Sequence, residues 1–133
     1  MTKEQKEKVK KLLSSYKTMK AQIECIDFGI NITKECIESL KELRDTESYI
    51  IEKNNEIEYK KVIKKRLEDC INSIDKALNE LSDTERKIVE LRYLESEKHT
   101  WNEISSRVGY SSDYCRKEIL DRILKKLYKN IIN

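Results

Sequence analysis

Proline is absent from the 133-residue chain, and glycine occurs only twice, as Gly29 and Gly109. Because β-sandwiches and barrels need many turns rich in glycine and proline, this scarcity argues against both architectures. Rossmann and P-loop enzymes also need glycine-rich loops to hold phosphate groups, and the sequence has none. Charged residues form 40% of the chain, which suits the solvent-facing sides of helices. The composition therefore predicts an all-α fold.

Long hydrophobic runs are also absent. The sequence has no stretch of 18 apolar residues, so no membrane span and no membrane partner are expected. Residues 1–11 are polar and lack the apolar core of a secretory signal. These features favour a cytoplasmic protein.

Residue types that bind metals or act as nucleophiles are few. His99 is the only histidine, and no two cysteines form a Cys-x-x-Cys pair. A zinc site and a Cys-His nucleophile are therefore not expected, and neither a cofactor nor an enzymatic activity is predicted. We interpret the cysteines as reduced, half-buried thiols; they are Cys25, Cys36, Cys70 and Cys115.

Charge is distributed unevenly along the chain. Residues 1–20 carry seven lysines and two glutamates, a net charge of +5. Residues 21–106 carry 14 basic and 20 acidic groups, or −6, and residues 107–133 carry seven basic and three acidic groups, or +4. The basic ends suit a polyanion such as double-stranded DNA, whereas the acidic middle argues against DNA wrapping the whole molecule.

Apolar residues in the N-terminal part recur at alternating steps of three and four, which is the period of a coiled-coil seam. The seam consists of Val9, Leu12, Tyr16, Met19, Ile23, Ile26 and Ile30. It predicts a long helix from about residue 3 to about residue 45. Glycine weakens a helix by about 1 kcal/mol, so a bend near Gly29 is the alternative.

A second seam follows a connection that we expect over residues 45–56, where Asn54-Asn55 is the strongest turn signal. The seam consists of Ile63, Leu67, Cys70, Ile74, Ala77 and Leu81. The two helices can pair as an antiparallel hairpin, but their expected lengths are about 60 Å and about 37 Å. A homodimer through these N-terminal helices, residues 1–81, would cover the excess seam. The alternative is a bent first helix that folds back on itself.

The C-terminal third, residues 82–133, contains three helix starts. Ser82-Asp83-Thr84-Glu85 and Thr100-Trp101-Asn102-Glu103 both have the pattern of a capping box. Ser111 and Ser112 are alternative N-caps for a third helix, and Gly109 suits the left-handed end of the second. The expected helices cover about 83–96, 101–108 and 112–130. A short helix, a glycine turn and a longer basic helix form a helix-turn-helix.

The candidate DNA-contacting residues follow from how such a motif docks. Its second helix enters the major groove with its N-terminal turns, while the apolar residues Cys115, Ile119, Ile123 and Leu127 share the opposite face. Arg116 suits guanine and Asp113 suits the amino group of cytosine. The full candidate set is Arg107, Ser111, Ser112, Asp113, Tyr114, Arg116 and Lys117. Lys125 and Lys126 are equally consistent with groove contact and with simple solvation. Trp101 is interpreted as a core residue, and His99 as part of a connecting loop, with a phosphate contact as the less favoured alternative.

Several segments resemble a known family. LSDTERKIVELRY, WNEISSRVGYS, Cys115-Arg116 and the run Arg122-Ile123-Leu124-Lys125-Lys126-Leu127 are similar to the helix-turn-helix in the fourth conserved region of bacterial sigma factors. With the heptad-bearing LLSSYKTMKAQIECI ahead of them, the chain resembles the ArpU/RinA-type phage transcriptional regulators. Cys115 replaces the usual valine and Ile123 the usual alanine. The resemblance implies a DNA-binding activator of phage or mobile-element genes whose recognition helix begins at Ser111 or Ser112.

Two other functions remain open. The chain could be a helical interaction protein that binds RNA polymerase or a sigma factor through its acidic middle. It could also be a phage DNA-packaging adaptor, a class that combines a helix-turn-helix with helical oligomerisation.

Overall fold

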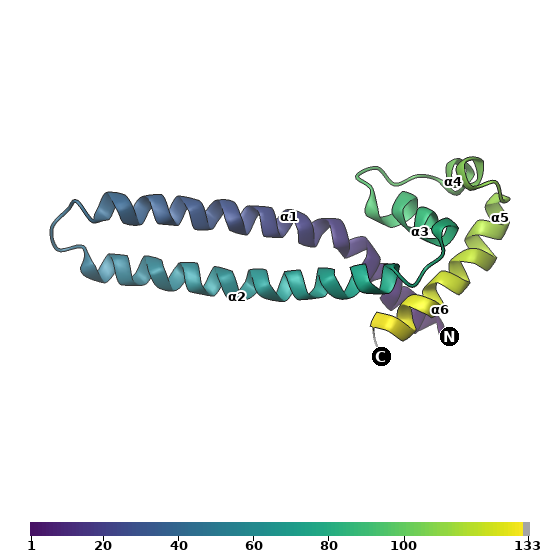
Figure 1. Cartoon of the computed structure of the whole chain (residues 1–133), viewed down its shortest axis with the longest axis horizontal. Coiled ribbons are helices and arrows are strands. Elements are labelled where there is room, and N and C mark those ends of the chain that lie inside the picture. Colours follow the sequence, from purple (N-terminus) through teal and green to yellow (C-terminus); the bar gives the residue numbers. More distant parts are fainter. Residues whose placement is uncertain (132–133) are drawn as a thin grey trace. The chain divides into compact units, whose positions relative to one another are not determined.

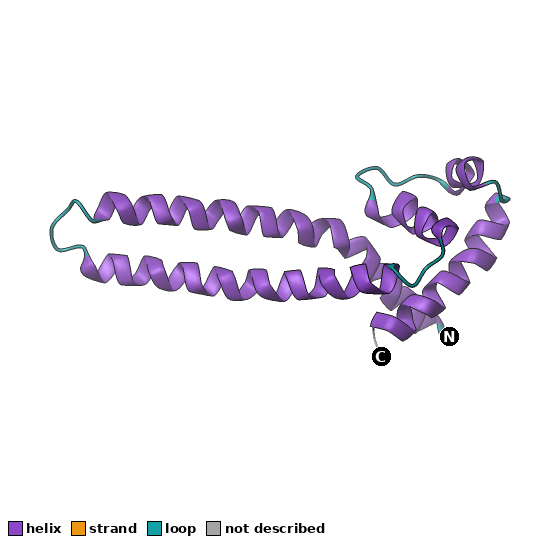
Figure 2. Cartoon of the chain, in the orientation of Figure 1, coloured by secondary structure: helices purple, strands orange, loops and turns teal. Residues whose placement is uncertain are grey.

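The computed structural model describes residues 1–131, and every regular element in this range is a helix (Figures 1 and 2). The expected all-α class is confirmed, with a long-helix hairpin ahead of a helix-turn-helix. The elements in chain order are α1 (Lys3–Leu40), α2 (Glu47–Leu78), α3 (Asp83–Val89), a π-helical turn η1 (Glu90–Leu94), α4 (Trp101–Val108), α5 (Ser112–Tyr114), a second π-helical turn η2 (Cys115–Ile119) and α6 (Leu120–Ile131).

The connection between the two long helices lies earlier than expected. It spans residues 41–46, and Asn54-Asn55 lies inside α2, so the expected connection over 45–56 is wrong. The turn uses Asp45 at a φ of 59°, a left-handed conformation that aspartate tolerates better than most residues. The buried Thr46 hydroxyl donates to the carbonyl of Leu40 at 2.8 Å. A side-chain hydrogen bond therefore closes the turn in place of glycine.

The two long helices are also closer in length than expected. α1 has 38 residues and α2 has 32, and α1 continues through Gly29 to Leu40. The length mismatch that favoured a dimer is therefore mostly absent. Each helix still has enough residues to pair along most of the other.

By packing, the chain forms two compact units. One, here called the hairpin unit, is residues 19–70; the other, the terminal unit, combines residues 1–18 with the described residues from 71 onward. Each unit therefore takes part of α1 and part of α2. The division into a region 1–81 for oligomerisation and a region 82–133 for DNA binding concerns function and stays a prediction.

The hairpin unit has a small core of its own. Ile30 and Ile37 of α1 pack with Ile57 of α2, and each is about 5–6% exposed. Lys64 Nζ of α2 pairs with Asp27 Oδ1 of α1 at 2.6 Å. The expected seam residue Ile30 is thus buried against a helix of the same chain.

The terminal unit contains most of the fully buried side chains. From α1 these include Val9 and Leu13, both 0% exposed, and from the end of α2 they include Ile74. Tyr16 donates its hydroxyl to Asp75 at 2.7 Å and joins the two helices. Leu13 lies outside the predicted seam, so the apolar face of α1 is broader here than a coiled-coil seam requires. The helix-turn-helix packs in this unit, and α3 contacts both α4 and α6.

Candidate nucleic-acid interface

The cap of α4 fixes the start of the motif. Thr100 accepts from the Glu103 amide, and the Glu103 side chain accepts from the Thr100 amide, so the predicted capping box is present. Ile104 is 0% exposed and anchors the short helix. At its end Gly109 has a φ of 82°, the left-handed conformation that glycine adopts without strain. The turn therefore forms where the sequence predicts it.

The next helix, residues 112–131, consists of α5, η2 and α6 without a break. Ser111 caps it, and its hydroxyl accepts from the Tyr114 amide at 3.1 Å. This matches the expected helix over 112–130 to within one residue. Ser111 is therefore the N-cap, and Ser112 is the first helical residue.

A π-helical turn brings the apolar face of this helix into one line. The expected apolar residues lie four positions apart, and four residues of an α-helix overshoot a full turn by about 40°. In η2 the amide of Leu120 donates to the carbonyl of Cys115, five residues earlier, which adds a residue to one turn. All four expected apolar residues are buried at 0–2% exposure; they are Cys115, Ile119, Ile123 and Leu127. Leu120 and Leu124 are buried as well.

The opposite face of the opening turns is exposed. Asp113, Arg116 and Lys117 are all exposed. Arg116 donates to Asp113 Oδ1 at 3.2 Å, with side chains 49% and 76% exposed. Such an exposed pair contributes less than about 1 kcal/mol, so Arg116 can exchange this partner for a base or a phosphate.

The other expected contact residues lie around the same turns. Arg107 is exposed on α4, and Ser112 is half-buried. The Tyr114 ring lies 5.5 Å from the ring of Tyr110, and its hydroxyl accepts from Arg122 at 3.4 Å. The structure thus gathers the seven candidates around the turn and the first turns of the helix, and their contacts with DNA stay predictions.

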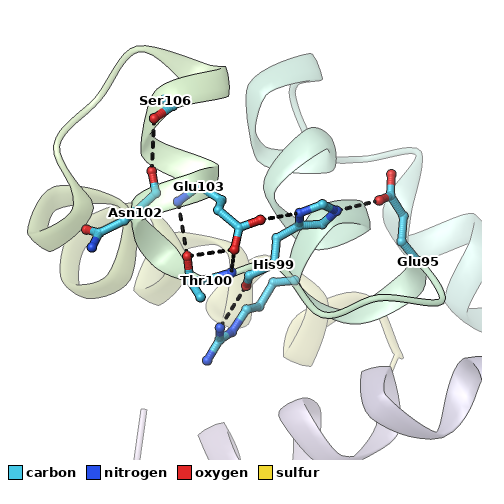
Figure 3. A network of polar contacts seen from close by, with 7 residues as sticks. Glu95, His99, Thr100, Asn102, Glu103 and Ser106 are labelled. Carbon is cyan, nitrogen blue, oxygen red and sulfur yellow. Dashed lines mark hydrogen bonds and ion pairs between the residues drawn. The ribbon is translucent and has the colours of Figure 1, made fainter.

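An unforeseen network holds the loop in front of α4 (Figure 3). His99 Nε2 lies 2.9 Å from Glu95 Oε2, and His99 Nδ1 lies 3.0 Å from Glu103 Oε2. Hydrogen bonding to Glu103, and then to Glu95, raises the pKa of His99, while the bond with His99 lowers the pKa of Glu103. Both ring nitrogens therefore have carboxylate partners. The four-residue spacing of Glu95, His99 and Glu103 was the available sequence signal.

Trp101 is less buried than a core residue. It is half-buried, and the guanidinium carbon of Arg92 lies 4.8 Å from the centre of its ring. Arg92 also donates to the carbonyl of His99 at 2.9 Å. The arginine therefore ties η1 to the loop and to the start of α4.

Lys126 has a structural partner. Its Nζ lies 2.7 Å from Glu85 Oε1, and the Glu85 side chain is only 8% exposed. Burial alone would raise the pKa of Glu85, but hydrogen bonds from Lys126 and Ser82 outweigh burial and lower it. Lys125, next to it, is exposed. No local sequence pattern indicates a contact between these residues, which lie 41 positions apart.

The thiols differ from the expectation in part. Cys25 and Cys36 are exposed, Cys70 is half-buried and Cys115 is buried, so only Cys70 fits the interpretation of a half-buried thiol. Burial raises the pKa of the Cys115 thiol. Among residues 1–131 no group of three or more His, Cys, Asp or Glu side chains is placed to hold a metal ion. No described helix is both long enough and apolar enough to cross a membrane.

Comparison with known proteins adds one finding. Neither a curated protein nor a solved structure matches the chain. A family model does match, over less than half of the chain but over nearly all of the helix-turn-helix. Residues 77–129 match Sigma-70, region 4, so the C-terminal part of the chain carries a sigma-like, DNA-binding helix-turn-helix.

Proposed function

We propose that the chain is a sequence-specific transcription regulator that reads the major groove with the helix over residues 112–131. One observation carries the proposal: Arg116 and Lys117 are exposed directly above the buried residues Cys115 and Ile119. The buried side chains therefore anchor one face of the helix in the core, while the cations of its first turns face solvent. A helix-turn-helix places these turns against base edges.

Each candidate residue has a role in this proposal. Arg116 donates two hydrogen bonds to guanine, and Asp113 accepts from cytosine. Ser111 keeps a hydroxyl proton for a phosphate although its oxygen caps the helix. The remaining candidates contact phosphates or the edges of flanking bases; they are Arg107, Ser112, Tyr114 and Lys117.

Selection of bound oligonucleotides from a random duplex library tests the proposal. We expect one enriched motif, and an affinity for it that falls steeply with salt. Arg116→Ala should weaken binding to that motif by about 1–3 kcal/mol. The matched control is Lys129→Ala, which removes an exposed cation of α6 far from the opening turns. Equal affinity of the Arg116→Ala variant and the wild type for the motif would refute the groove assignment.

We further propose that two copies pair through the hairpin unit. Phe28 and Ile32 are 67% and 50% exposed, and their spacing of four places them on one face of α1. Tyr59 and Val62 of α2 are exposed to a similar extent. Light scattering should give twice the mass of one chain for the wild type, and the mass of a single chain for Phe28→Lys. Leu43→Lys, at an exposed leucine in the connecting turn, is the control.

The genetic setting is the last part of the proposal. By its resemblance to the ArpU/RinA type, the chain would act in the cytoplasm of a bacterium as an activator of phage or mobile-element genes. Sigma region 4 binds RNA polymerase as well as DNA, which supports polymerase as a second partner. A polymerase pull-down with no DNA shift at low salt would favour the adaptor function instead.

A further inference from the structure

A pocket of about 360 Å³ lies beside the opening turns of the helix over residues 112–131, entirely within the terminal unit. Its lining comes from α1, from η1, from the loop before α4, and from α4, η2 and α6. It consists of Lys10, Ser14, Arg92, Tyr93, Lys98, Trp101, Arg116 and Leu120. Four of these side chains are cations and none is a carboxylate. The pocket therefore has the charge of a site for an anion.

One of these cations, Lys10, and the hydroxyl of Ser14 come from α1, far in sequence from the matched residues 77–129. An isolated helix-turn-helix would provide neither of them. Several contacts hold the walls in position. Lys17 of α1 donates to the carbonyl of Ser96 in the loop at 3.4 Å, and Lys6 of α1 pairs with Asp121 of α6 at 2.5 Å.

Two of the four cations in the pocket, Lys10 and Arg116, have weak competing partners. Lys10 pairs with Glu7 at 3.4 Å, and the Glu7 side chain is 62% exposed. Arg116 pairs with Asp113, which is 76% exposed. Exposed pairs of this kind are largely screened by water and salt. A phosphodiester can therefore replace Glu7 as the partner of Lys10, and guanine can replace Asp113 as the partner of Arg116, without leaving a buried charge unpaired.

From this arrangement we propose that the pocket holds a backbone phosphate of the bound duplex, and that Lys10 of the N-terminal helix contacts it. The inference rests on the proposed DNA binding, because Arg116 belongs to both surfaces. A phosphate here would fix the register of the opening turns against the groove and would carry no sequence information itself. The N-terminal helix thus becomes part of the DNA-binding surface.

Fluorescence anisotropy on the full chain, with the selected duplex and a scrambled duplex, tests the role of Lys10. Lys10→Ala should lower affinity about tenfold for both duplexes and reduce the slope of log affinity against log salt by about 1. Lys98→Ala should act in the same direction, and Lys10→Arg should retain affinity. Lys11→Ala, at the next and exposed position, should stay within about twofold of wild type.

Each outcome separates the two proposals. If the wild type binds the selected duplex but Lys10→Ala behaves as Lys11→Ala does, the pocket assignment is wrong and the groove assignment stands. If the wild type binds neither duplex at low salt, the DNA-binding function fails and the pocket assignment falls with it. If Lys10→Ala weakens the selected duplex alone, the residue reads bases and the phosphate role is refuted. Far-UV circular dichroism confirms that each variant is folded.

Discussion

The pair formed by Glu85 and Lys126 joins the start of α3 to α6. Glu85 Oε1 accepts from the Ser82 amide at 2.9 Å and from Lys126 Nζ at 2.7 Å. The Glu85 side chain is 8% exposed, whereas the Lys126 side chain is 47% exposed. The carboxylate therefore serves both as the acid of a capping box and as the buried half of an ion pair.

The expected cost of losing this carboxylate follows from those two roles. Loss of a capping interaction costs about 1 kcal/mol. Breaking a fully buried pair costs about 3–5 kcal/mol, but an exposed pair contributes less than about 1 kcal/mol, and this pair lies between the two cases. Glu85→Ala should therefore lower the free energy of unfolding by about 2–3 kcal/mol. Glu85→Gln retains an acceptor for the Ser82 amide and should cost about 1–2 kcal/mol.

A double-mutant cycle with Glu85→Gln and Lys126→Met isolates the pair. Urea unfolding followed by the fluorescence of Trp101, the only tryptophan, should give a coupling energy of about 1 kcal/mol at pH 7. The pKa of folded Glu85 is lowered, so this stability is present above its ordinary pKa and is lost as the pH falls through the lowered value. Coupling below about 0.3 kcal/mol would refute the pairing. Lys126→Met should also leave DNA affinity unchanged, since its ammonium group is engaged with Glu85.

Two further predictions concern the loop and the glycines. Hydrogen bonds to Glu103 and Glu95 raise the pKa of His99, so the stability it contributes is complete below about pH 6.5 and is lost as the pH rises through the raised value. The NMR shift of the C2 proton of His99 should report a pKa above the ordinary value of a histidine. A pKa at or below 6.5 would contradict the network. Gly109→Ala should cost about 1 kcal/mol in urea unfolding because φ is 82°. Gly29→Ala should instead stabilise α1, since its Cβ would meet only the flexible end of Lys60 at 3.2 Å; equal effects of the two changes would refute the backbone argument.

The parts of the fold that the sequence predicted well are those set by local chemistry. Both capping boxes, at Ser82 and Thr100, depend on residues three positions apart, and both are present. The left-handed turn at Gly109 depends on one residue. Periodicity correctly identified which residues of the C-terminal helix are buried, but it gave no sign of the π-helical turn that places them on one face.

The parts that failed depend on contacts between distant segments. Asn54-Asn55 has the composition of a turn, but Ile50 and Ile57 around it pack against α1, and this packing outweighs the weak helix propensity of asparagine. The turn forms instead around Asp45 and Thr46, where a hydroxyl replaces glycine. The Glu85–Lys126 pair and the pocket around Lys10 join residues from separate elements, so no local pattern could reveal them.

The π-helical turn η2 lies between the exposed start of the C-terminal helix and its packed end. Arg116 and Lys117 lie within η2, and the residues after it meet α1, where Gln5 Nε2 donates to the Tyr128 hydroxyl at 3.1 Å. Without the extra residue, the steps of four would rotate the apolar face by about 40° at each step. The buried residues of α6 would then turn away from the core while the opening turns kept their direction. The single wide turn therefore lets one helix expose cations at its start and remain packed against the N-terminal helix at its end.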